Sequence, residues 1–132
     1  MADSGQEERK HIFAINGSVD FLNIVRDLFQ EEDYNVTTTN FVPNSFEQIR
    51  ALQPDALIVD VAVGESAGWE LLEELHEAAA TDQIPVLVLS TSPHLLERAR
   101  EQAERYGTHR YLEKPFDLDA LLDNIRAMIG EA

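Results

Sequence analysis

Cysteine is absent from the 132 residues of this chain. Disulfide bonds, thiolate metal sites and a cysteine nucleophile are therefore excluded, and an intracellular location is permitted. Long apolar runs are also missing, since the longest hold only a few residues and fall far short of a bilayer span. Residues 1–10 contain no apolar signal core. We expect a soluble, cytoplasmic domain over residues 10–132, preceded by a disordered tail over residues 1–9.

Basic residues are scarce in this sequence. The 10 lysines and arginines are outnumbered by 25 aspartates and glutamates, and the formal net charge is -15. A field of this sign repels phosphate backbones and anionic membranes, so we expect neither a nucleic acid nor a membrane as partner. Two interpretations of the acidic residues stay open. They can simply keep a small domain soluble, or they can form a face that binds a basic partner.

The chain does contain a regular alternation of two apolar periods. Short β-branched or fully apolar runs predict strands, and apolar residues three and four apart predict amphipathic helices between them. The predicted strands are His11–Ile15, Tyr34–Thr39, Ala56–Asp60, Ile84–Leu89 and Thr108–Glu113. The predicted helices cover Phe21–Phe29, Phe46–Leu52, Trp69–Ala80, Pro93–Tyr106 and Leu118–Ile129, with Ser18 or Asp20, Ser92 and Asp117 as N-caps.

This alternation predicts an α/β fold of the flavodoxin-like type, a doubly wound five-stranded parallel sheet with five helices, because parallel strands need right-handed crossovers. The carboxyl ends of such strands share one edge, where ligands bind. Asp60, Ser90 and Lys114 stand at three of these ends. Taken alone, an acid after a strand more often bonds the next turn. Together, a carboxylate, a hydroxyl and an ammonium group suit phosphoryl chemistry.

The stretch from about residue 10 to 130 resembles the receiver domains of two-component response regulators. These flavodoxin-like modules are phosphorylated on aspartate by histidine kinases. The motifs that carry the resemblance are Pro54–Asp60 with the later Gly68, Ile84–Ser90, and Tyr111–Phe116. Each motif is common by itself, whereas their joint order and spacing over the full length is specific.

The resemblance implies a role for each matching residue. Asp60 is expected to be the phosphoacceptor, Ser90 the switch hydroxyl and Lys114 the lysine that contacts the phosphoryl group. Tyr111 is expected to be the rotating aromatic residue of the output face. The bond between Lys114 and Pro115 is expected to be cis, a form that proline makes accessible.

One departure from the family concerns the metal site. Receivers follow the first strand with two acids that hold Mg²⁺, and here those positions are Asn16 and Gly17. Mg²⁺ prefers anionic oxygen ligands, so we expect no cofactor or only weakly bound Mg²⁺, with Asp60 and the carbonyl of Ala62 as weak ligands. Asp60 is then free to pair directly with Lys114. Asp20 and Glu65 stay open as substitute ligands.

These observations predict a stand-alone, atypical receiver domain that is not an enzyme. We expect weak or absent Mg²⁺-dependent phosphorylation, and signalling through the fourth helix, the fifth strand and the fifth helix. The expected partner is a protein, either a histidine kinase or a second copy of the chain. One alternative is a working phosphoacceptor with substitute metal ligands. Another is a flavin or nucleotide binder that uses the turn at Asn16, Gly17 and Ser18.

Overall fold

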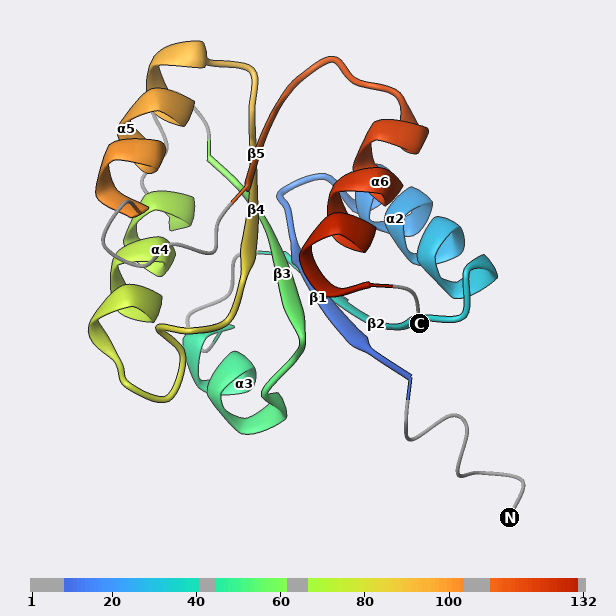
Figure 1. The fold of residues 1–132 in the computed structure, drawn as a ribbon, viewed down its shortest axis with the longest axis horizontal. Helices are drawn as coiled ribbons and strands as arrows, with labels where there is room; N and C mark the ends of the chain where they lie inside the picture. Colours follow the sequence, from blue (N-terminus) through green and yellow to red (C-terminus); the bar gives the residue numbers. More distant parts are fainter. Residues whose placement is uncertain (1–8, 41–44, 62–66, 104–109, 131–132) are drawn as a thin grey trace.

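The computed structural model describes residues 9–40, 45–61, 67–103 and 110–130, with strands and helices in the alternation expected from the sequence (Figure 1). Residues 1–8 of the expected tail lie outside this range. Of the described helices, none has the length and apolar character needed to cross a membrane. The elements are β1 (His11–Ile15), α2 (Val19–Glu31), β2 (Asn35–Thr39), α3 (Ser45–Leu52), β3 (Ala56–Asp60), α4 (Ala67–Glu77), β4 (Val86–Ser90), α5 (Pro93–Ala103), β5 (Arg110–Glu113) and α6 (Leu118–Ile129).

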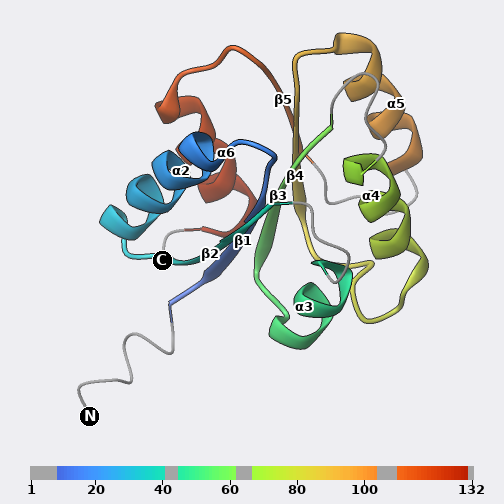
Figure 2. The ribbon, with the colours of Figure 1, turned by 180° about the vertical axis from the view of Figure 1, so that it is seen from behind.

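The strands form one parallel sheet in the order β2-β1-β3-β4-β5. Helices α2 and α6 cover one face, and α3, α4 and α5 cover the other, as the two opposite views in Figures 1 and 2 show. The order with β1 inside and the chain wound in both directions is the flavodoxin-like one. The predicted fold class is therefore confirmed.

Two apolar clusters, one on each face, hold the sheet between the helices. Phe13, Leu57 and Val88 belong to the cluster under α3, α4 and α5. Ile58 and Leu87 belong to the cluster under α2 and α6. Each fully buried side chain of this size contributes about 1.5–3 kcal/mol relative to an exposed one. Burial on both faces is why the central strands read as continuous apolar runs instead of alternating ones.

The predicted bounds of α4 and β4 were wrong at all four ends, since the structure gives Ala67–Glu77 and Val86–Ser90. The helix ends at Glu77 instead of Ala80 because Thr81 Oγ1 donates to the carbonyl oxygen of Leu75 at 2.7 Å, which satisfies one of the last helical carbonyls. Strand β4 begins at Val86 instead of Ile84 because Ile84 N–H still donates to Thr81 O within the turn. Ile84, the predicted first residue of the strand, therefore belongs to the turn that precedes β4.

The N-caps agree with the sequence in two of three cases. Ser18 accepts a hydrogen bond from Phe21 N–H at 3.2 Å, and Ser92 accepts one from Leu95 N–H at 3.2 Å. Asp117 occupies the N-cap position of α6, but its side chain accepts no cap hydrogen bond. Its backbone carbonyl instead accepts from Ala120 N–H. The predicted helix end at Tyr106 and the predicted strand start at Thr108 lie outside the described residues.

Gly68 lets the first turn of α4 approach the backbone of β3 closely. The residue is buried, and a Cβ atom built on it would overlap the backbone oxygen of Asp60. At Gly17, by contrast, no heavy atom outside the glycine and its two chain neighbours lies within 4 Å of such a Cβ. The two glycines therefore form a matched pair for measuring close packing.

We expect Gly68→Ala to lower the free energy of unfolding by about 1–3 kcal/mol, because the added methyl group has to displace backbone. Gly17→Ala should change it by less than about 0.5 kcal/mol, since that position is open. Urea unfolding of the two variants measures both values. Equal stability of the two variants would contradict the close approach.

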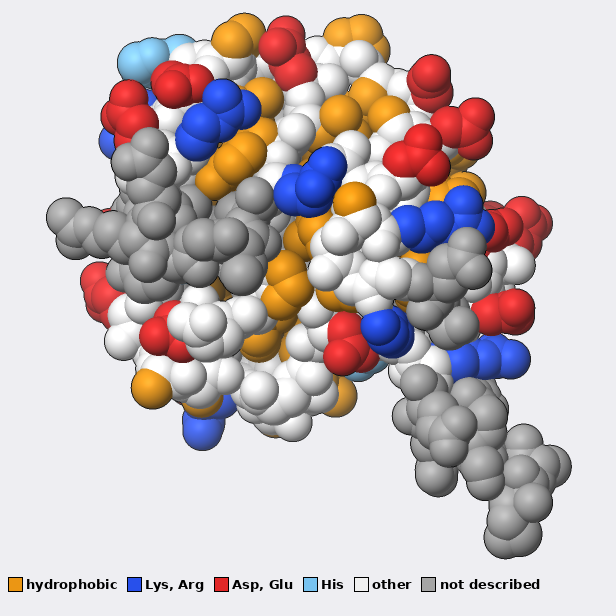
Figure 3. Space-filling view, viewed as in Figure 1, with side chains coloured by type: hydrophobic (Ala, Val, Ile, Leu, Met, Phe, Trp, Pro, Cys, Tyr) orange, Lys and Arg blue, Asp and Glu red, His pale blue; other side chains and the backbone are white. Residues whose placement is uncertain are grey.

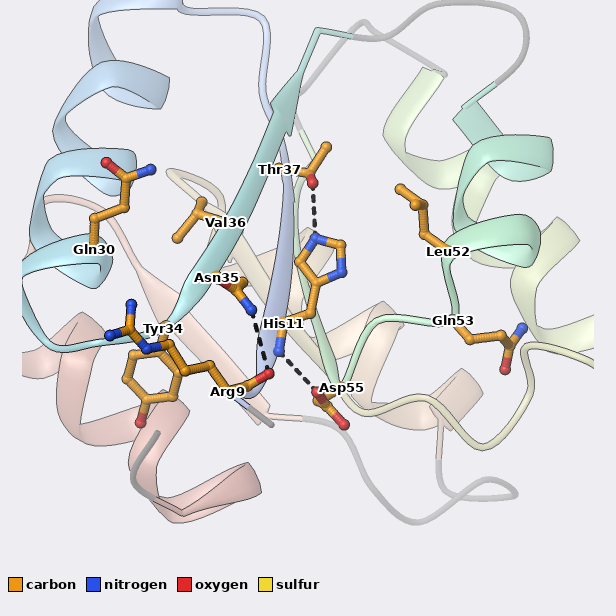
Figure 4. Close-up of a pocket in the computed structure, with 10 residues that line it drawn as sticks. All are labelled: Arg9, His11, Gln30, Tyr34, Asn35, Val36, Thr37, Leu52, Gln53 and Asp55. Atoms are coloured by element: carbon orange, nitrogen blue, oxygen red, sulfur yellow. Dashed lines mark hydrogen bonds between the residues drawn. The ribbon is translucent and has the colours of Figure 1, made fainter. Parts of the chain in front are cut away.

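His11 joins β1 to β2 at the amino end of the sheet. Its Nε2 lies 2.7 Å from Thr37 Oγ1, and its backbone N–H donates to Asp55 Oδ2 at 2.7 Å (Figure 4). Burial lowers the pKa of His11 below the ordinary 6.5, and the charge of Asp55 opposes the shift. Burial also lowers the pKa of His76, a buried residue of α4, with Asp82 opposing.

Both histidines should make the fold less stable in mild acid. Their folded-state pKa values lie below 6.5, so the unfolded chain takes up protons first as the pH falls through 6.5. The free energy of unfolding is then highest above this pH and decreases below it. Chemical unfolding at a series of pH values measures the decrease, and His11→Gln should reduce its slope. An unchanged slope in that variant would contradict the role of His11, and His94→Gln on the surface is the control.

Candidate functional site

The carboxyl ends of four strands bring four of the predicted site residues to one edge of the sheet. Asn16 follows β1, Asp60 ends β3, Ser90 ends β4 and Lys114 follows β5. Lys114 N–H donates to the carbonyl oxygen of Ser90 at 2.8 Å, which extends the pairing of β4 and β5 by one residue. The bond between Lys114 and Pro115 is cis, as the resemblance implies.

An ion pair joins Asp60 to Lys114. The lysine Nζ lies 2.6 Å from Asp60 Oδ1, and the two side chains are 27% and 15% exposed for Lys114 and Asp60 respectively. This partial burial distinguishes the pair from an exposed surface salt bridge, because water screens the two charges less. The direct pairing expected from the sequence is therefore present.

Phe21 lies beside this pair and packs against Phe116, and the sequence analysis assigned neither ring to the site. Lys114 Nζ is 5.4 Å from the ring centroid of Phe21, a distance that allows a cation–π contact. The rings of Phe21 and Phe116 meet edge to face, with centroids 6.3 Å apart. The sequence signal for Phe116 was its place directly after Lys114 and Pro115. Phe21 carried no such signal, since it reads as one more apolar residue of a helix.

Ser90 has no exposed surface. Its Oγ accepts a hydrogen bond from Ser92 N–H at 3.1 Å, which holds the hydroxyl under the turn that leads into α5. The hydroxyl thus occupies the expected strand end but lies entirely inside the protein.

Asn16 is 5% exposed, and its side chain has a fixed orientation. Oδ1 accepts a hydrogen bond from Ser18 N–H at 2.9 Å. If the amide were flipped, its NH₂ group would face the Ser18 N–H group, and two donors would oppose each other. The contact with Ser18 N–H therefore identifies which amide atom is the oxygen. Nδ2 has no hydrogen-bond partner among the described residues. An unpaired buried donor lowers the free energy of unfolding by about 1–3 kcal/mol.

Mg²⁺ takes oxygen ligands, and Asn16 and Gly17, at the metal positions that the resemblance implies, offer no carboxylate. Asn16 has its oxygen engaged and offers an N–H group, and Gly17 has no side chain to offer. Asp20 is exposed in the first turn of α2, while Ala62 and Glu65 lie outside the described residues. Within the described ranges, no cluster of three or more histidines and acids could hold a metal ion.

Three backbone N–H groups around the turn after β1 already donate hydrogen bonds within the protein. Asn16 N–H donates to Thr39 O at 3.2 Å. The N–H groups of Ser18 and Phe21 donate to the side chains of Asn16 and Ser18. A flavin or nucleotide phosphate needs several such donors at once. These three groups are therefore engaged in the fold, and the flavin or nucleotide binder stays an untested alternative.

Tyr111 lies half-buried on β5, away from the ion pair, against the cluster under α3, α4 and α5. Its hydroxyl donates to the carbonyl oxygen of Ala99 at 3.5 Å, and the guanidinium of Arg100 lies 5.2 Å from its ring centroid. Arg98 lies 4.7 Å from the ring of Trp69 on α4. Two arginines of α5 thus contact aromatic rings on both neighbouring elements.

A cavity of about 690 Å³ lies at the opposite, amino end of the strands (Figure 4). Its lining includes His11, Thr37, Leu52 and Asp55, from β1, β2, α3 and the residue before β3. None of the site residues expected from the sequence lines it. The chemistry at the carboxyl ends is therefore separate from this cavity.

Comparison with known proteins agrees with the geometry. The model of the response regulator receiver domain family matches residues 12–126. The heme response regulator HssR of Staphylococcus saprophyticus is 31% identical over 82% of this chain and 46% of its own length. The response regulator MprA of Mycobacterium leprae is 33% identical over 73% of this chain and 40% of its own length. The chain thus spans less than half the length of these two relatives.

A solved structure shows the same fold. The receiver domain of the sensor histidine kinase PA1611 from Pseudomonas aeruginosa, with a magnesium ion coordinated in its active-site cleft, superposes with a TM-score of 0.75. The match covers 93% of this chain and 99% of that one, at 19% identity. The chain belongs to the response regulator receiver domain family, the receiving modules of two-component signalling.

Proposed function

We propose that this chain is an atypical receiver domain, in which Mg²⁺-dependent phosphorylation of Asp60 is weak or absent and the signal passes through protein contacts. One observation carries the proposal. At Asn16, where the family has its first metal-binding acid, the side-chain oxygen is bonded to Ser18 N–H and the remaining group is an amide donor. We also propose that the chain is a signalling module and not an enzyme, whether or not it stands alone.

Electrostatics supports the same proposal. The family's acid pair adds two negative charges beside the phosphoacceptor, whereas Asp60 here is balanced by Lys114 at 2.6 Å. Two unit charges roughly 4 Å apart attract by about 4 kcal/mol at an effective dielectric constant of about 20, before desolvation is counted. Losing two carboxylates beside a divalent ion therefore removes several kcal/mol of gross attraction.

Asp60 remains the proposed phosphoacceptor, with Ser90 and Lys114 as the groups that contact the phosphoryl oxygens. Phosphoryl transfer ordinarily relies on a metal ion to neutralise the developing charge. Without it, an incoming phosphoryl group meets only the ammonium of Lys114 and hydrogen-bond donors. Slow transfer follows from this reduced set of charges.

The proposed contact surface consists of α5, β5 and α6 and includes Tyr111, the proposed output residue. Hydrophobic side chains are visible between α5 and α6, over β5, with Lys, Arg, Asp and Glu side chains around them (Figure 3). Arg98 and Arg100 belong to the same helix, where they contact aromatic rings. A mixed surface of this kind suits a protein partner, and we propose a histidine kinase or a second copy of the chain.

The alternative is a working receiver that holds Mg²⁺ with substitute ligands. The coordinated magnesium ion of the PA1611 receiver favours it. In this chain the ligands would be Asp60, the carbonyl of Ala62, and Asp20 or Glu65. The exposed position of Asp20 in α2 requires its side chain to reach toward the cleft from the helix start.

Titration with Mg²⁺ separates the two proposals. We expect the amide NMR shifts of Asp60 and its neighbours to show no saturation at millimolar Mg²⁺, because the ligand oxygens are missing. The double variant Asn16→Asp/Gly17→Asp should gain saturable binding, since Gly17 has open space for a side chain. Saturation of the unmodified chain at millimolar Mg²⁺, lost in Asp60→Asn, would contradict the atypical site and support substitute ligands.

A further inference from the structure

The amide nitrogen of Asn16 is a buried hydrogen-bond donor with no partner among the described residues. Buried donors are nearly always paired, so the position suits an acceptor. The side chain cannot turn over to relieve this, because Ser18 N–H holds its oxygen. Ile15 pairs with Val59, so Asn16 stands level with Asp60 on the neighbouring strand. An acceptor bound to Asp60 would lie within the same part of the edge.

The charges around Asp60 point in the same direction. In a typical receiver, the two metal-binding acids and Mg²⁺ cancel each other's formal charge. Replacing both acids by Asn16 and Gly17 and omitting the metal therefore leaves the net charge of a phosphorylated site unchanged. Lys114, 2.6 Å from the Asp60 carboxylate, is retained as the cation. With Asp60 phosphorylated and no divalent ion bound, this site would therefore have the same net charge as a typical phosphorylated receiver site that holds Mg²⁺.

We infer that Asp60 is a metal-independent phosphoryl site, in which Asn16 Nδ2 and Lys114 Nζ donate to the phosphoryl oxygens. The inference rests on the proposed role of Asp60 as phosphoacceptor. With acetyl phosphate, a carboxylate oxygen of Asp60 forms the new bond to phosphorus. The bond from phosphorus to the acetate oxygen breaks, and its electron pair leaves with acetate. No proton is transferred, and the charge that Lys114 contacts moves from the carboxylate to the phosphoryl group.

Labelling by acetyl phosphate in buffer stripped of divalent cations tests the inference, with intact mass as the readout. The initial rate for the unmodified chain should change by less than about twofold when Mg²⁺ is added. Asp60→Asn should take up no label. In Asn16→Asp/Gly17→Asp the rate without metal should fall by about tenfold or more, because the new carboxylates repel the phosphoryl group. Added Mg²⁺ should restore it.

Two further variants isolate the amide. Asn16→Ala removes the donor without adding charge, and we expect it to slow labelling in stripped buffer by about fivefold. Asn23→Asp/Gln30→Glu adds the same two charges on the exposed side of α2 and should leave the rate unchanged. A native rate in Asn16→Ala would overturn the role of the amide.

The outcomes distinguish this inference from the proposed function. If the unmodified chain takes up no label with or without Mg²⁺, the metal-independent site is overturned, while the atypical receiver stands. If labelling requires Mg²⁺ and rises more than about tenfold with it, the proposed function itself fails. Labelling that is equal in both buffers supports both.

Discussion

The ion pair between Asp60 and Lys114 depends on the parallel register of three strands. Asp60 ends β3 and Lys114 follows β5, with β4 between them. Parallel pairing of all three strands brings Ser90 to the same edge as these two residues, because an antiparallel β4 would end on the opposite edge. The hydrogen bond from Lys114 N–H to Ser90 O continues the pairing into the site. The 2.6 Å contact between Lys114 Nζ and Asp60 Oδ1 therefore depends on the alignment of β3, β4 and β5.

Close packing on both faces of the sheet completes the site. On one face, Gly68 allows α4 to approach the backbone oxygen of Asp60. On the other, Phe21 and Phe116 pack edge to face beside the Lys114 ammonium. The charged pair is thereby removed from most of the solvent while keeping some exposure. A partly buried pair of opposite charges is a polar site with little net charge.

The fold followed from apolar spacing alone because helices on both faces bury β1, β3 and β4, and burial of this kind leaves continuous apolar runs. The element ends were less predictable. Helix α4 ends early because the Thr81 hydroxyl bonds to Leu75, and Asp117 stands at the N-cap of α6 without a side-chain cap hydrogen bond. Local polar groups compete for these ends, and apolar periodicity contains no information about that competition.

The sequence by itself determined which residues stand at the strand ends, including Asn16 and Gly17 after β1, because parallel strands share one edge. It also identified Asp60, Ser90 and Lys114 as site candidates, although their chemical roles remain predictions. The tertiary structure alone decided that Ser90 is fully buried, that the Phe21 ring lies beside Lys114, and that the amide nitrogen of Asn16 is buried. These features depend on contacts between separate elements and on which atom accepts the Ser18 hydrogen bond, which no spacing along the chain encodes.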